Sequence, residues 1–262
     1  MANDFIRPNI IQDFIEGPEY ITRYEEHDLQ VLKALAETAD ILKTDKNLLN
    51  NHLIKYKGSN DEMVVIEFKY EKKESRYTAA NPLLSLSQNF KAIVYEKYEY
   101  LDIVNRNYCI LYELSKIYDI EVLAIETFVQ NYKNIAEEYA SINDFKSKFS
   151  KIAFHPEKHE DSEEEFVRHL SNDVKSLKEK LQDEYHQFKL MQIIEIHSAY
   201  IIDRIHDYLV DNEFIKRDYC AMGNNVIFFK PLKDFVKNDE IERIQQFLYS
   251  QTGFHINLRS KE

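Results

Sequence analysis

The feature that most constrains the fold is a nearly continuous apolar pattern between Leu190 and Val210. Apolar side chains occupy almost every side of the helix that this stretch predicts, and a helix that is apolar all round lies inside a protein. We therefore expect it at the centre of a core, with Ile201 and Ile205 fully buried between the helical middle of the chain and a C-terminal hairpin. Charged residues such as Glu195 and Asp203 interrupt the stretch, so it does not reach the roughly 20 apolar residues of a membrane span.

A second helical pattern precedes it, from about Ser162 to Phe188, and is apolar along one stripe only. Apolar residues spaced three and four apart are the pattern of an amphipathic helix. We expect a half-exposed arm whose stripe binds a partner protein, through Phe166, Leu170, Val174, Leu177 and Leu181.

Composition limits the class of protein. With 262 residues the chain is long enough for one domain or two. Its start has no basic segment followed by an apolar one, so we expect no signal peptide. Cys109 and Cys220 are its only cysteines, which favours a reduced, cytoplasmic protein without a disulfide framework. The net charge of −12 argues against general binding to nucleic-acid backbone, although a local basic patch stays open.

Only four glycines occur, and they are isolated from one another. The chain therefore lacks the glycine-rich loops that hold nucleotide phosphates in Rossmann proteins and P-loop ATPases. It also lacks HExxH and CxxC patterns, and the histidines around residues 155–169 lie in an acidic, unperiodic segment. We expect neither a cofactor nor a metal.

The remaining pattern predicts a mainly α protein of the α+β class, a long-helix bundle with two small β-hairpin units. Further helices are expected at about residues 8–17, 19–42, 45–53, 82–118, 120–142 and 239–252. One hairpin is expected from residues 53–57 and 63–70, a second from 214–219 and 226–230, and a last strand at 254–258.

These elements divide into N-terminal helices with a hairpin (1–80), a helical middle (81–154), an acidic linker (155–162) and a long helix with a C-terminal hairpin, helix and strand (163–262). Helices followed by a hairpin are similar to the winged-helix order over Asp28–Lys73 and Met191–Lys230. This resemblance implies a winged-helix accessory subunit of a DNA-organising ATPase.

Glu67-Phe68-Lys69 resembles the E-x-K half of a PD-(D/E)xK nuclease. In that chemistry Glu67 and an upstream acid such as Asp61 hold a divalent metal, while Lys69 steadies the attacked phosphate. The alternative is an outward strand face that carries alternating charges, and we favour it because no Pro-Asp half of the motif is present.

Eighteen tyrosines and sixteen phenylalanines are the last feature of the composition. Tyrosine is favoured at protein interfaces because it offers a large area and a polar tip, and we expect Tyr98 and Tyr112 to bind partners. The sequence therefore predicts a non-enzymatic adaptor or structural subunit of a cytoplasmic assembly, with partner proteins or self-association and no membrane. A metal-dependent nuclease using Glu67, Lys69 and Asp61 and a winged-helix accessory subunit are the alternatives.

Overall fold

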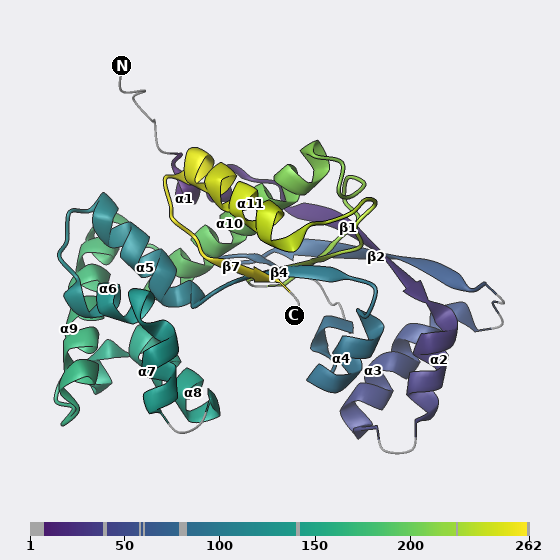
Figure 1. The fold of residues 1–262 in the computed structure, drawn as a ribbon, viewed down its shortest axis with the longest axis horizontal. Helices are drawn as coiled ribbons and strands as arrows, with labels where there is room; N and C mark the ends of the chain where they lie inside the picture. The colour runs from purple at the N-terminus through teal and green to yellow at the C-terminus, as the bar shows by residue number, and fades with distance from the viewer. Residues whose placement is uncertain are drawn as a thin grey trace.

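The computed structural model describes residues 8–38, 41–57, 59, 61–78, 83–139, 142–223 and 225–260. Over these residues the chain is mainly helical with two antiparallel sheets, which confirms the predicted α+β class. The molecule is elongated: helices α5–α9 form one end, α2–α4 form the other, and the second sheet lies between them (Figure 1).

The helices are α1 (Ile10–Glu16), α2 (Leu29–Glu37), α3 (Lys43–Leu53), α4 (Gln88–Val94), α5 (Arg106–Ile117), α6 (Leu123–Gln130), α7 (Tyr132–Glu138), α8 (Ile142–Phe154), α9 (Glu165–Glu184), α10 (Leu190–Asp211) and α11 (Lys237–Thr252). Short 3-10 turns occur at Ile54–Tyr56, Leu83–Ser85 and Pro156–Lys158. The strands are β1 (Tyr20–Asp28), β2 (Met63–Lys72), β3 (Tyr77–Thr78), β4 (Glu99–Ile103), β5 (Ala221–Met222), β6 (Val226–Phe229) and β7 (Leu258–Ser260).

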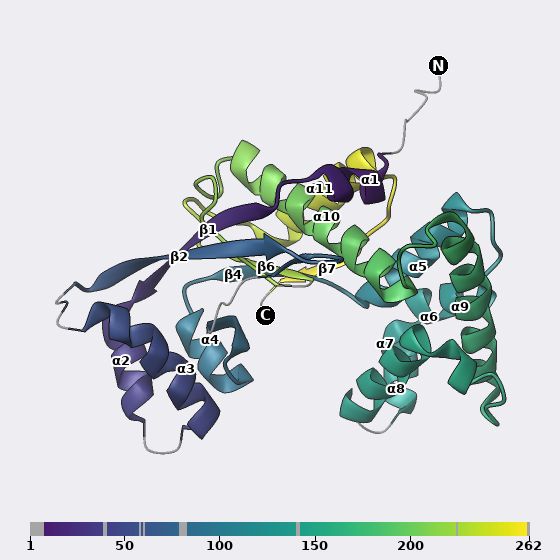
Figure 2. The same ribbon diagram turned by 180° about the vertical axis from the view of Figure 1, so that it is seen from behind.

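The first sheet has the order β1-β2-β3, and β1 and β2 form a long ribbon that reaches α2 and α3 (Figure 2). The register runs from Tyr20 opposite Glu71 to Asp28 opposite Met63. The predicted helix over residues 19–42 is therefore wrong for its first part, and so is the predicted hairpin, because β2 pairs with β1 and not with 53–57. The turn expected at Gly58 and Asn60 lies outside the described residues.

A polar inward face explains why β1 was not predicted. The strand alternates strictly, but the side chains that it buries are Arg23, Glu25 and His27. A half-buried strand is identified by apolar residues on the buried face, and here that face is ionisable. The two strands and α2–α4 enclose the ribbon core, which contains Leu29, Leu32, Leu35, Leu49, Val64, Ile66, Phe68, Tyr70, Val94, Tyr95 and Tyr98.

The second sheet has the order β5-β6-β4-β7, with antiparallel pairing throughout. The predicted C-terminal hairpin is present, but its first strand is shorter and later than expected, and the last strand is β7. Strand β4, an inner strand of this second sheet, lies inside the segment predicted as a single helix over residues 82–118. The prediction was wrong because α4, β4 and α5 follow one another closely. Leu101, Val104, Tyr108 and Leu111 keep the 3-4-3 spacing of a helix although they extend from β4 into α5. The predicted start of that helix, Pro82, lies outside the described residues.

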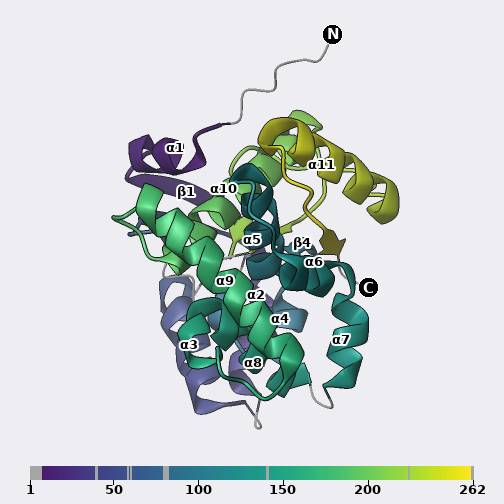
Figure 3. The ribbon, with the colours of Figure 1, turned by 90° about the vertical axis from the view of Figure 1, so that its left-hand side faces the viewer.

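Helix α10 is the centre of the larger core, as predicted, and both Ile201 and Ile205 are 0% exposed. It contacts α1, α5, α11 and β6. Helix α9 departs from the prediction, because it lies across α5, α6 and α8 (Figure 3). Its stripe is buried from Leu170 to Leu181, and only Phe166 at its start is half-buried. The helical core formed in this way includes Leu111, Phe128, Phe149, Val167, Leu170, Leu177, Ile193, Ile201, Ile205, Leu209, Ile227, Leu248 and Phe254.

The predicted domain division cuts across the second sheet and stays a prediction. Strand β4, from the predicted middle, pairs with β6 and β7 from the predicted C-terminal part. The predicted linker packs against α9, because Glu157 and Glu160 form ion pairs with Lys178 and Lys175. The predicted boundary at residues 80–81 lies outside the described residues. None of the helices that the structure describes has both the length and the apolar character to cross a membrane.

Candidate functional site

The residues of the nuclease alternative do not meet in space. Glu67 and Lys69 lie on the exposed face of β2, where the Lys69 ammonium sits 3.7 Å from the ring centroid of Tyr20. Asp61 precedes the strand and accepts a hydrogen bond from Ser59 at 2.7 Å. Because a strand rises by roughly 3.3 Å per residue, the stretch from Met63 to Glu67 alone separates the two acids by about 13 Å. Among the described residues no cluster of three metal-ligating side chains occurs.

Most of the residues predicted to bind partners are already used inside the chain. Leu170, Val174, Leu177 and Leu181 are buried in the helical core, so they offer no surface in this conformation, and their contact with a partner stays a prediction. The α9 stripe is buried because α6 and α8 cover it, and a helix pattern alone cannot show whether the covering element belongs to the same chain.

The three aromatic residues of that prediction differ from one another. Tyr98 is buried: its hydroxyl accepts a hydrogen bond from the Glu26 N–H at 2.8 Å and donates one to the Glu26 carbonyl at 2.9 Å. It therefore closes the edge of β1 and is not a partner surface. Tyr112 is half-buried and donates to Glu126 at 2.6 Å. Phe166 is half-buried beside Phe128.

A cavity of about 250 Å³ lies between the second sheet and the helical end of the molecule. Strand β4, the start of α5, helices α6–α8 and strand β7 all contribute to its wall. The charged and amide side chains of the wall are Asp102, Asn105, Arg106, Asn107, Lys146, Asn225 and Arg259. Three cations against one carboxylate give this wall an excess of two positive charges, although the whole chain carries a net charge of −12.

The one carboxylate of this wall is held by its neighbours. Arg259 donates from Nε to Asp102 Oδ2 at 2.9 Å and adds a second bond from Nη2, and Asn225 donates to Oδ1. Burial raises the pKa of Asp102 above its ordinary value, while the bonds from Arg259 and Asn225 act in the opposite direction. Asp102 therefore fixes β7 to β4 and is not a free base.

Three hydrogen-bond donors of the same wall have no acceptor within the described part of the chain. The first is Nδ2 of Asn105, which is buried. Asn105 precedes α5 with φ of 50°, a left-handed conformation that asparagine tolerates, and its side chain makes no capping bond. The others are the ammonium of the exposed Lys146 and Nη1 of Arg259, whose side chain is 57% exposed. A buried donor without a partner costs about 1–3 kcal/mol, and of these three donors only Asn105 Nδ2 is buried. The exposed ends of Lys146 and Arg259 are open to solvent or to a ligand.

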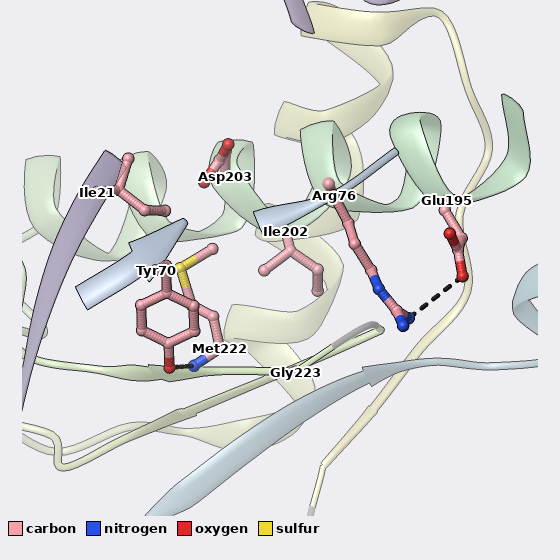
Figure 4. A pocket seen from close by; sticks show the side chains of 9 residues that line it. Ile21, Tyr70, Arg76, Glu195, Ile202, Asp203, Met222 and Gly223 are labelled. Carbon is pink, nitrogen blue, oxygen red and sulfur yellow. Dashed lines mark hydrogen bonds and ion pairs between the residues drawn. The ribbon is translucent and has the colours of Figure 1, made fainter. Parts of the chain in front are cut away.

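Arg106 connects this wall to the ribbon. Its Nε donates to Asn107 at 3.0 Å, and burial lowers its pKa while the nearby carboxylate of Glu195 opposes that shift. Glu195 in turn forms an ion pair with Arg76 at 3.2 Å (Figure 4). The carboxylate of Glu195 therefore binds Arg76 and lies near enough to Arg106 to oppose the effect of its burial.

The cavity beside Arg76 and Glu195 is much smaller, at about 20 Å³ (Figure 4). Its wall includes Tyr70, whose hydroxyl accepts a hydrogen bond from the N–H of Met222 at 3.1 Å. A volume of this order holds one water molecule. It is a packing gap between the ribbon, α10 and β5, and we assign it no ligand.

Neither cysteine is available as a nucleophile. Cys109 and Cys220 are free thiols and both are buried. Burial raises the pKa of each thiol to about 12, and the thiolate is the reactive form. The cysteines therefore belong to the packed interior.

Sequence reasoning missed the larger cavity because its wall is assembled from positions as far apart as residues 102 and 259. Only Asn105, a turn-forming residue just before a helix, was a local signal. The wall gathers cationic, amide and aromatic side chains from these distant positions. Neither a protein-family model nor a curated protein matches the chain, so its function is argued from this site.

Proposed function

We propose that the chain is a non-enzymatic binding protein, an adaptor or structural subunit that recognises an anionic group in the 250 Å³ cavity. The observation that supports this proposal is that one wall brings together a buried donor without a partner, on Asn105, and the exposed cations of Lys146 and Arg259. An anion supplies acceptors, and hydrogen bonds between charged groups are about twice as strong as neutral ones.

We infer binding and not catalysis from the acids, bases and nucleophiles that are near the cavity and from how they are held. Catalysis by proton transfer needs an acid or base within hydrogen-bond reach of the substrate. Asp102 is bound by Arg259 and Asn225, and the raised thiol pKa values remove the cysteines as nucleophiles. The remaining lining groups are cations, amides, one serine and aromatic rings.

The adaptor part of the proposal includes partner proteins or self-association in the cytoplasm. It is supported by Tyr20 and Tyr249, which are each 49% exposed, because tyrosine is enriched at protein interfaces. The free thiols of Cys109 and Cys220 support a reducing compartment.

The test is stabilisation of the full chain by anions. We expect phosphate and sulfate to raise the melting temperature more than chloride does at equal ionic strength, since a ligand that binds the folded state stabilises it. Lys146→Ala is expected to remove most of this difference. Lys151→Ala is the matched control, because Lys151 is also exposed on α8 but does not line the cavity. Equal melting temperatures in all three salts would refute the proposal.

A further inference from the structure

The wall of the cavity that faces the cations is aromatic. Tyr108, Phe128, Phe145 and Phe149 are buried, and Phe128 lies 4.4–5.9 Å from the other three between ring centroids. Such a cluster is rigid because each ring is held by its neighbours.

Tyr132 is the aromatic residue of this wall that remains partly exposed. It is half-buried, and it stands edge to face against Phe128 at 5.8 Å and against Phe145 at 5.3 Å. A ring fixed on two sides in this way loses little conformational freedom when a ligand packs on it, so a planar ligand ring that stacks on it strengthens binding.

The size and the donors limit what can bind. About 250 Å³ lies just below the range of roughly 300–1,000 Å³ that is typical of drug-sized ligands, so a dinucleotide would not fit. Asn105, Lys146 and Arg259 offer three donor groups, and the wall has two positive charges in excess. A phosphate monoester matches both numbers, because it has three terminal oxygens and close to two negative charges at neutral pH.

We propose that the ligand is a phosphate monoester attached to a planar ring, the chemistry of a nucleoside monophosphate, with its phosphate beside Asn105 and its ring on Tyr132. This inference rests on the proposed function and names the ligand class of the same cavity. The phosphate position agrees with the start of α5, a 12-residue helix whose first N–H groups favour an anion. Glycine-rich loops are absent, so side-chain donors replace the backbone ones.

The experiment is isothermal titration calorimetry of the full chain with four phosphate-bearing probes and adenosine. AMP and phenyl phosphate carry an aromatic ring, whereas ribose 5-phosphate and inorganic phosphate carry none. We expect the two ring-bearing probes to bind at least about 10-fold more tightly than the other two, and adenosine, which has no phosphate, to bind about 10-fold or more weakly than AMP. If AMP and phenyl phosphate bind with equal affinity, the cavity recognises only the ring and the phosphate, and this result supports the proposal.

Variants separate the ring from the phosphate. Tyr132→Ala should weaken AMP about 10-fold and leave inorganic phosphate unchanged, while Tyr132→Phe should bind AMP as the natural chain does. Tyr200→Ala on α10 is the control, because this tyrosine is also half-buried and does not line the cavity. Circular dichroism and the melting temperature show whether Tyr132→Ala is folded. If it is not, the comparison of the probes on the natural chain still decides whether a ring is recognised.

Two outcomes would overturn the inference, and they differ in what they leave standing. If all phosphate-bearing probes bind equally, the ring assignment is wrong while the anion-binding function survives. If neither AMP nor inorganic phosphate binds, and phosphate does not stabilise the fold, the proposed function is wrong as well.

Discussion

The helical core and the ribbon core bury side chains of different kinds. Around α9 and α10 the interior is almost entirely aliphatic and aromatic. The ribbon core also buries ionisable groups: His27 Nε2 bonds to Glu25 at 2.8 Å, the Tyr95 hydroxyl donates to the same Glu25 oxygen at 2.8 Å, and His52 stacks on Phe68. The first kind of core depends on volume and the second on hydrogen-bond partners, so single substitutions should damage them by different routes.

The largest effect is expected at Glu25, whose side chain is fully buried. Glu25→Ala leaves His27 and Tyr95 without their shared acceptor, and each buried group left without a hydrogen-bond partner costs about 1–3 kcal/mol. Urea denaturation gives the free energy of unfolding. Glu67→Ala is the matched control, because Glu67 lies on the exposed face of the same ribbon, and we expect less than about 0.5 kcal/mol there. Equal losses at both positions would show that the polar network does not stabilise the ribbon core.

In the helical core, Leu177→Ala and Ile205→Ala are expected to cost about 2–5 kcal/mol each, because both side chains are 0% exposed and truncation leaves a cavity. Similar losses would confirm that α9 and α10 belong to one core. Leu123→Ala, at a residue that is 62% exposed on α6, should change stability little. A small loss of stability in Leu177→Ala together with a large loss in Ile205→Ala would instead support the half-exposed arm that the sequence predicted.

Acid should weaken both regions through one histidine each. Burial lowers the pKa of His52 and of His197 to about 4, from 6.5. Between pH 6.5 and 4 the unfolded chain therefore binds a proton that the folded chain rejects. Stability falls as the pH falls through this window, by at most about 1.4 kcal/mol per pH unit for each histidine, and is constant above it.

The check is urea denaturation of the natural chain, His52→Asn and His197→Gln at pH 7, 6 and 5. Each substitution should make the loss between pH 7 and pH 5 smaller than in the natural chain. The prediction fails for a histidine whose replacement leaves that pH dependence unchanged. The two variants together show whether protonation destabilises the ribbon core or the helical core at the higher pH.

The smallest effect on stability is expected at the cavity, where Asn105→Gly tolerates the φ of 50° and removes a buried donor without a partner. We expect the free energy of unfolding to change by less than about 1 kcal/mol. Stabilisation by phosphate should nevertheless fall in a thermal shift assay. A large loss of stability with unchanged phosphate binding would make Asn105 a structural residue.

Local periodicity explains which parts of the fold were predictable. Helix α10 has Ile201 and Ile205 in a segment with almost no polar side, so its burial followed directly. Strand β1 was missed because its inward face carries Glu25 and His27. These charges are tolerated inside only because Tyr95, about 70 residues away, supplies a hydrogen bond. The candidate site was not predictable at all, since no short pattern joins Asp102 to Arg259.

The sequence by itself determined the α+β class, the burial of α10, the C-terminal hairpin and the outward face of β2 with Glu67 and Lys69. The tertiary structure decided which strand β2 pairs with, that α9 is covered by its own chain, and that a cavity forms between β4, α5, α8 and β7. The physical reason is range. Helix and strand periods are set by the next few residues, whereas the bond from Arg259 to Asp102 joins positions 157 residues apart. Only the folded chain brings such groups together.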